Sequence, residues 1–309
     1  MSTPGRTDDD TWDIATSVGA TAVMVANARA AETASERPLI RDEFAQILIG
    51  GPELTELVAK MASTSAADPE LEVIQRHMID YQAARTHFFD AYFAAAATTG
   101  IRQHVILAAG LDSRAYRLDW PAGTTVYEVD QPKVLEYKAA TLAAHGAQPT
   151  ADRREVAADL RFDWPKTLRD EGFDPAQRTG WLAEGLLMFL PGEAEERLFA
   201  DVDALSAPGS RVCIEDFIFD DAGREAFQKR RVKTDELRQR LGDENVFDPG
   251  DLWYMDDERC DPAGWFTARG WRVESQAGHD YLTQLGRQPL EDTGVASTFR
   301  ARFVSAEKP

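Results

Sequence analysis

The feature that most constrains this chain is a series of short apolar runs that begins after Gly100. Helix-compatible segments separate the runs, among them residues 133–144 and 193–205. Such runs are typical of strands buried in a parallel sheet, and their alternation with helices indicates βαβ units. We therefore predict an α/β protein with a mostly parallel sheet and helices on both faces. The expected strands are 104–109, 124–129, 154–158, a strand within 180–190, and 210–217.

The C-terminal part of the chain departs from this alternation. Residues 271–276 and 298–305 have the composition of strands, and the polar stretch between them lacks a full helical crossover. We therefore expect an antiparallel pair at one edge of the sheet, which brings the total to seven strands. Together these features predict one domain over residues 1–309.

The first hundred residues predict a helical cap (1–100) on the core (101–309). Residues 13–34 and 71–97 are free of proline and rich in small and apolar residues, as expected of packed helices. In the second helix an aromatic stripe recurs at helical spacing, and we interpret it as core. Arg85 lies on the same stripe and needs a partner, because a buried guanidinium without one is costly. The stripe consists of Tyr81, Phe88, Phe89 and Tyr92.

Charge and composition exclude several classes of partner. The net charge of −19 disfavours nucleic acid and anionic membranes, because phosphates would be repelled. No apolar run approaches the roughly 20 residues that span a bilayer, and no signal peptide is evident. Cys213 and Cys260 form no CxxC pair, so we expect no disulfide and no metal site. These observations predict a cytoplasmic protein.

A long insertion, residues 219–262, interrupts the core. Its first half, 223–241, carries seven bases and three acids, and its second half, 246–255, is loop-like with Phe247, Trp253 and Tyr254. One interpretation is a solvated helix followed by a surface loop. The other is a lid over a substrate pocket, because long insertions in compact domains are often functional. An anionic acceptor would be attracted by these bases.

The first two strand ends predict an adenosine-containing cofactor. Gly110 follows the first strand, and Asp130 ends the second, twenty residues later. A glycine at this turn permits close backbone approach, and an acid here can accept both ribose hydroxyls. The GxGxxG pattern of a dinucleotide site is missing, and Asp112 would repel a phosphate. S-adenosyl-L-methionine (SAM) has no phosphate and has an amino group that an acid binds, so these residues favour SAM over NAD.

Two further acids extend the predicted site. Asp159 follows the third strand, where its carboxylate would accept from the adenine amino group while the amide of Leu160 contacts a ring nitrogen. The alternative for Asp159 is a helix N-cap. Glu184 is expected inside an apolar strand, where an unpaired carboxylate is costly, so a role in the site is favoured.

Five ordered motifs carry a resemblance to a known family. They are Arg85-Thr86-x-Phe88-Phe89-Asp90, the run 106–117 around Ala109-Gly110-Leu111-Asp112, Glu128-Val129-Asp130-x-Pro132, Asp159-Leu160-Arg161-x-x-Trp164-Pro165, and 183–188 around Glu184. Together the chain resembles the leucine carboxyl methyltransferase-like group, and most of all its mycobacterial SAM-dependent members. The resemblance implies a Rossmann-like methyltransferase fold over nearly the whole chain.

The resemblance also implies roles for the site residues. Arg85 would bind the SAM carboxylate, Gly110 and Asp112 would line the methionine part, and Asp130 would hold the ribose. Asp159 and Leu160 would flank the adenine, with Glu184 near the methionine end. One departure concerns Phe189, since members of the carboxyl methyltransferase branch can carry tyrosine after the Glu184 motif.

The predicted reaction is methyl transfer to an oxygen of a small-molecule acceptor, in particular a carboxylate. A carboxylate is ionised at neutral pH and needs no general base, which agrees with five scattered histidines that form no recognisable dyad. Two alternatives stay open at this point, an NAD-dependent oxidoreductase and a SAM-binding protein without activity. A serine hydrolase is disfavoured, because the sequence contains no GxSxG elbow.

Overall fold

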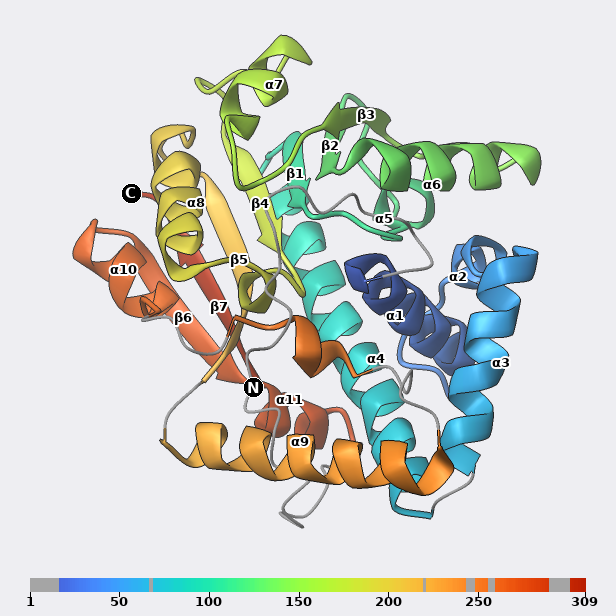
Figure 1. Ribbon diagram of the computed structural model, residues 1–309. Coiled ribbons are helices and arrows are strands. Elements are labelled where there is room, and N and C mark those ends of the chain that lie inside the picture. The colour runs from blue at the N-terminus through green and yellow to red at the C-terminus, as the bar shows by residue number, and fades with distance from the viewer. Residues whose placement is uncertain (1–16, 67–68, 219–220, 243–247, 255–258, 289–300) are drawn as a thin grey trace.

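A seven-stranded sheet with the order β3-β2-β1-β4-β5-β7-β6 forms the centre of the protein (Figure 1). The computed structural model describes residues 17–66, 69–218, 221–242, 248–254, 259–288 and 301–309. The strands are β1 (Gln103–Leu107), β2 (Thr125–Asp130), β3 (Asp152–Ala157), β4 (Thr179–Ala183), β5 (Arg211–Phe217), β6 (Arg272–Ala277) and β7 (Ala301–Glu307).

Helices precede and separate these strands. The N-terminal hundred residues contain α1 (Ser17–Thr33), α2 (Glu43–Leu48), α3 (Pro52–Ala66) and α4 (Pro69–Thr98). Within the core follow α5 (Arg114–Arg117), α6 (Pro132–Ala144), α7 (Trp164–Asp170), the short 3₁₀ helix η1 (Leu187–Phe189), α8 (Gly192–Ala204), α9 (Asp221–Leu241), the 3₁₀ helix η2 (Pro249–Leu252), α10 (Pro262–Ala268) and α11 (Gly278–Gln284). No helix in these described ranges is long and apolar enough to cross a membrane.

The pairing of the strands confirms the predicted α/β fold. Strands β3, β2, β1, β4 and β5 are parallel neighbours, and β7 runs antiparallel to both β5 and β6. The expected antiparallel edge is therefore present, with β7 inserted between β5 and β6. The stretch after β6 begins with the seven-residue helix α11, and β7 then runs antiparallel to β6. The first three residues expected for the last strand, at 298–300, lie outside the described part of the chain.

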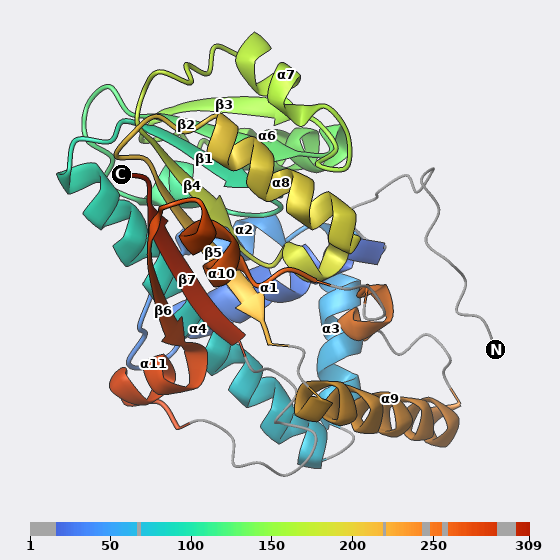
Figure 2. The same ribbon diagram turned by 90° about the vertical axis from the view of Figure 1, so that its left-hand side faces the viewer.

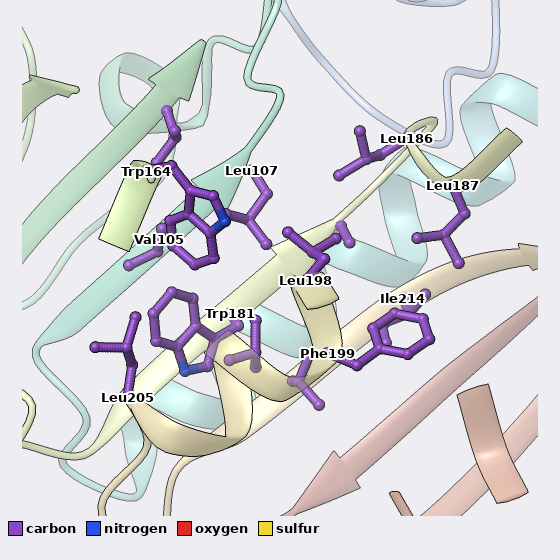
Figure 3. Packing of buried hydrophobic residues seen from close by; sticks show 14 of the residues in the cluster. Val105, Leu107, Trp164, Trp181, Leu186, Leu187, Leu198, Phe199, Leu205 and Ile214 are labelled. Carbon is purple, nitrogen blue, oxygen red and sulfur yellow. The ribbon is translucent and has the colours of Figure 1, made fainter. Parts of the chain in front are cut away.

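The sheet buries both of its faces, as alternation of side chains along each strand requires. On one face, Trp181 of β4 packs with Trp164 of α7, and Phe199 of α8 belongs to the same cluster, which is drawn in Figure 3. On the other face, Leu182 contacts a second cluster that includes Phe89 of α4. Figure 2 shows α8 and α10 on one side of the sheet and α1 and α4 on the other. Truncation of a fully buried residue such as Trp181 would cost about 3–5 kcal/mol.

The long helix α4 joins the cap to the sheet. The predicted aromatic stripe is core: Phe89 is fully buried, and the ring of Phe88 lies 4.6 Å from that of Phe303 in β7. Tyr81 is buried as well, whereas Tyr92 is partly buried against the same cluster. Arg85 lies between Tyr81 and Phe89 on the same face of α4, where it meets Glu184 after β4 and Glu215 of β5.

Candidate active site

The turn after β1 contains two residues whose backbone conformation favours glycine. Ala108 and Gly110 both have positive φ angles, 53° and 47°, a region that side chains disfavour. A Cβ atom on Gly110 would lie 3.3 Å from the Cβ of Ala22 in α1. Helix α1 therefore packs closely against this turn, and both the positive φ angle and the short contact favour glycine at position 110.

Asp130, the last residue of β2, is joined to that turn. Its Oδ2 accepts a hydrogen bond of 2.6 Å from the amide of Gly110, and its Oδ1 accepts one of 2.6 Å from the amide of Gln131. Burial raises the pKa of Asp130, and the two amides oppose that rise. Each carboxylate oxygen retains a lone pair, so Asp130 can still accept bonds from hydroxyl groups of a ligand.

Asp159 lies two residues beyond the end of β3. Its Oδ2 forms an ion pair of 2.7 Å with Arg161, and its Oδ1 accepts from the Arg161 amide at 2.9 Å. Burial raises the pKa of Asp159, but Arg161 outweighs that effect and the pKa is lowered overall. The N-cap interpretation of Asp159 is wrong, because Asp163 caps α7. Leu160 is partly buried against the cluster of the α7 and α8 face.

Glu184 does not lie inside a strand, contrary to the prediction. Strand β4 ends at Ala183, and the chain turns at Gly185, whose φ angle is 63°, before η1 begins. The expectation that this carboxylate needs partners is confirmed. Its Oε1 lies 2.9 Å from Nε of Arg85, and its Oε2 lies 2.7 Å from Nη1 of Arg114.

A second buried carboxylate, Glu215 of β5, meets the same arginine. Its side chain is fully buried, and its Oε2 accepts from Nη1 of Arg85 at 2.8 Å and from the Gly185 amide at 2.7 Å. The hydroxyl of Tyr81 donates to Oε1. Burial raises the pKa of Glu215, and Arg85 acts against that rise. The sequence reasoning missed Glu215, although an acid within an apolar run was the same signal that identified Glu184.

Arg114 connects the loop after β4 with the turn after β1. Its guanidinium pairs with Glu184, with Asp112 and with Asp90, the last at 2.7 Å. Arg117 pairs with Asp90 at 2.6 Å. Burial raises the pKa of Asp112 and of Asp90, but the neighbouring arginines outweigh it and both values are lowered. Arg114, Arg117 and Asp90 lie within the sequence motifs, but the sequence alone indicated no role for them.

The structure thus brings most of the predicted residues together. Arg85, Glu184 and Asp112 belong to one ion-pair network through Arg114, and the Gly110–Asp130 hydrogen bond lies at the same turn as Asp112. Asp159 and Leu160 lie at the end of the neighbouring strand β3. The arrangement offers carboxylates for an ammonium group and for hydroxyls, and a guanidinium for a carboxylate. In the described part of the chain, no group of three or more His, Cys, Asp or Glu could hold a metal ion.

The amino-acid sequence matches the model of one protein family. The match is to the family described as leucine carboxyl methyltransferase and extends over residues 22–203, more than half of the chain. The chain belongs to the leucine carboxyl methyltransferase family. The resemblance drawn from the five motifs is therefore confirmed, and the matched range contains all seven predicted site residues of this family member.

Mycobacterial relatives extend this similarity to nearly the whole chain. A protein of Mycobacterium marinum named "Putative S-adenosyl-L-methionine-dependent methyltransferase" is 56% identical, with 98% of this chain and 99% of that protein covered. The protein of the same name from Mycobacterium ulcerans is 55% identical over the same shares. Among solved structures, the magnesium protoporphyrin IX methyltransferase of Synechocystis PCC 6803 with bound SAH is a distant likeness. It is 14% identical, with a TM-score of 0.45 and 78% and 88% of the two chains covered.

Two remaining residues of this family member can be placed. Phe189, the departure noted in the Glu184 motif, is a buried residue of η1. His87 lies outside the ion-pair network: its Nδ1 is 2.8 Å from the hydroxyl of Tyr281 in α11. This contact joins α4 to α11.

Proposed function

We propose that this protein transfers the methyl group of SAM to an oxygen atom of a small-molecule acceptor, and that the acceptor oxygen is a carboxylate. Its class, a SAM-dependent methyltransferase, follows from membership in the leucine carboxyl methyltransferase family and from the near-full-length similarity to the mycobacterial proteins. Neither finding supports an NAD-dependent oxidoreductase. The observation that carries the proposed cofactor site is the network of Arg85, Glu184 and Arg114 at the strand ends.

We propose that Arg85 binds the carboxylate of the cofactor. Its two ion pairs use Nε and Nη1, and neither of them uses Nη2, which is the nitrogen we assign to the cofactor. Glu184 and Asp112 would bind the cofactor's ammonium group, since ionised carboxylates accept strong charge-assisted bonds. A guanidinium held between two buried carboxylates stays oriented, so little conformational entropy is lost when a ligand binds.

The adenosine half of the cofactor would lie across the ends of β1, β2 and β3. We assign the ribose hydroxyls to Asp130, the adenine amino group to Asp159, and a ring nitrogen to the amide of Leu160. The fit is supported at Gly110, where a Cβ would meet Ala22 and where the glycine lets a ligand approach the backbone.

Alignment and exclusion of water would then supply catalysis. The sulfonium of bound SAM supplies the electrophilic methyl group. The chain holds the methionine end in a buried network, and a carboxylate acceptor is already ionised at neutral pH. No proton has to be removed, so the protein's task is to hold two reactants in line in a site that excludes water.

We further propose that residues 1–309 form one domain and that the insertion 219–262 covers the acceptor side. Helix α9 lies beyond the end of β5, outside the layers of the sheet (Figures 1 and 2). Arg224 and Arg231 on this helix are exposed and would attract an anionic acceptor. Arg230 and Lys233 belong to the same basic set, but their side chains lie outside the described part of the chain.

The test is transfer of a labelled methyl group from SAM to matched acceptors. Each small carboxylic acid in a panel is paired with its amide and its alcohol. We expect label in at least one acid and none in its amide, with the product hydrolysed by base to release methanol. Transfer only to alcohols or amines would refute the carboxylate proposal and leave the class intact. Tight SAM binding with no transfer to any acceptor would favour a binding protein without activity.

A further inference from the structure

The described parts of the insertion pack on each other. The ring of Phe227 in α9 stacks on that of Trp253, with centroids 5.6 Å apart and planes at 17°. Gly250 makes room for this contact, because a Cβ there would lie 2.8 Å from Cε2 of Phe227. Two polar contacts, Thr234 to Asp248 and Arg238 to Asp251, join the helix to the same segment. Helix α9 and residues 248–254 therefore pack together as one unit.

Arg259 joins this unit to the loop that contains η1. Its Nη1 donates to the carbonyl of Leu187 at 2.9 Å, and its Nη2 donates to the carbonyls of Leu190 at 2.8 Å and of Tyr254 at 2.9 Å. The amide of Tyr254 donates in turn to the carbonyl of Met188 at 2.9 Å. One guanidinium thus bonds to backbone carbonyls of both segments, residues 187–190 and Tyr254.

The charge of Arg259 is balanced by Glu195 of α8. This carboxylate has a relative exposure of 2% and forms an ion pair with Nη1 of Arg259. The thiol of Cys260 donates to its other oxygen at 3.6 Å. Burial raises the pKa of Glu195 to about 7, against the effect of Arg259. The ion pair joins Arg259 to α8, and removal of either partner would leave the other charge buried and unpaired.

The loop that Arg259 holds begins at the cofactor network. Glu184 and Gly185 immediately precede residues 186–190, and Glu184 pairs with both Arg85 and Arg114. Gly185 donates to Glu215. The loop is therefore held at its start by the network and at its end by Arg259, with only a few residues between the two.

We propose that Arg259 is a positioning residue that fixes the 185–190 loop against the insertion. The part of the site assigned to the cofactor then keeps one position relative to the part assigned to the acceptor. The proposal rests on the proposed function for the identity of the two parts. Arg259 itself touches neither reactant and acts through the loop that follows Glu184.

The experiment compares Arg259→Met and Arg259→Lys with the wild-type protein by hydrogen exchange and by SAM titration. Arg269→Met is the matched control, because Arg269 lies over the ring of Trp265 at 3.4 Å and bonds the Trp265 carbonyl rather than the 187–190 loop. We expect Arg259→Met to speed amide exchange at least tenfold in 185–190 and in 248–254 together, and to weaken SAM binding about 3- to 10-fold. Arg259→Lys should show smaller changes, since lysine cannot reach all of these acceptors.

The outcomes separate this proposal from the proposed function. Exchange is measured without ligand, so it tests the role of Arg259 even if SAM is not bound by the wild-type protein. Unchanged exchange in either segment, or a rise spread evenly over the whole chain, would overturn the proposal. If Arg259→Met does not fold, Arg259→Lys carries the test, because lysine cannot reach all of the carbonyl acceptors and should still speed exchange in the same two segments. Arg259→Lys with wild-type exchange there would equally overturn the proposal.

Discussion

The arginines at the strand ends and the bases of α9 show two different uses of charge. Arg85 and Arg114 are buried, and their carboxylate partners lie as far as 130 and 70 residues away in the chain. On α9, Lys229 pairs with Glu225 one turn away, and both side chains are more than half exposed. A buried guanidinium needs partners from whichever elements surround it, whereas an exposed base is satisfied by water and by its own helix.

This difference has energetic consequences. Removing one partner of a buried ion pair costs about 3–5 kcal/mol, because the other charge stays buried. Exposed pairs one turn apart contribute roughly 0.3–0.5 kcal/mol. If the two regions are understood correctly, substitutions in the network should change stability and cofactor binding, and substitutions of the exposed bases Arg224 and Arg231 on α9 should change neither.

The largest effect is expected for Arg85→Ala. Glu184 and Glu215 lose a cationic partner in a buried setting, so the free energy of unfolding should fall by about 3–5 kcal/mol, and SAM binding should be lost as well. Arg85→Lys should recover only part of both, because lysine lacks the planar fork. Urea unfolding and calorimetry measure the two quantities. Wild-type stability of Arg85→Ala would mean that the network is not the structural hub described here.

The next effect is expected for Asp130→Ala. A charge-assisted hydrogen bond contributes roughly 1.5–3 kcal/mol, so SAM affinity should fall about 10- to 100-fold while the protein stays folded. Asp130→Asn is the matched variant, since it keeps the shape and one oxygen acceptor. Titration calorimetry with each protein gives the comparison. Unchanged affinity in both would remove Asp130 from the cofactor site.

An intermediate effect is expected for Glu195, which is buried like the network but has a pKa near neutrality. Its pKa is raised to about 7 from 4.5, so the folded state binds its proton more tightly than the unfolded state. The stability from this group is complete below pH 4.5 and is lost as the pH rises through 7. Between pH 8 and pH 6 the wild-type protein should therefore gain about 1 kcal/mol from Glu195. Urea unfolding of Glu195→Gln should lack that gain, and an identical slope in both proteins would contradict the assignment.

The smallest effect is expected on α9. Replacing Arg224 and Arg231 together by glutamine should change the free energy of unfolding by less than about 0.5 kcal/mol and leave SAM affinity unchanged. With an anionic acceptor, its capture should slow, most of all at low salt where screening is weak. A large loss of stability would show that these bases are not the exposed charges that the comparison requires. Salt-independent wild-type kinetics would show that they do not attract the acceptor.

The sequence was sufficient for the fold because hydrophobic periodicity is local. Five parallel strands, the antiparallel edge and the long helix of the cap were all predicted from runs of a few to about thirty residues. Strand ends were less certain: the strand before Glu184 ends earlier than expected, because Gly185 turns the chain with a positive φ angle. The apolar residues after it form η1 instead.

The sequence did not predict which residues pair with one another in the site. A buried Arg85 predicted that a carboxylate would meet it, but nothing in the sequence states which of the many acids in the chain does so. The position of Glu215 beside Arg85 depends on the register of β5 against β4. Only the assembled sheet determines that register. The role of Arg259 could not be predicted either, because its acceptors are backbone carbonyls, and no sequence pattern indicates which carbonyls a side chain will meet.

The most direct test of the central claim is titration calorimetry of the purified protein with SAM, with its demethylated product and with NAD. The network at the strand ends and the turn at Gly110 suit a ligand with an amino-acid end and no phosphate. We therefore predict micromolar binding of SAM and of the demethylated product, and far weaker binding of NAD. NAD binding as tight as that of SAM, or tighter, would contradict this account.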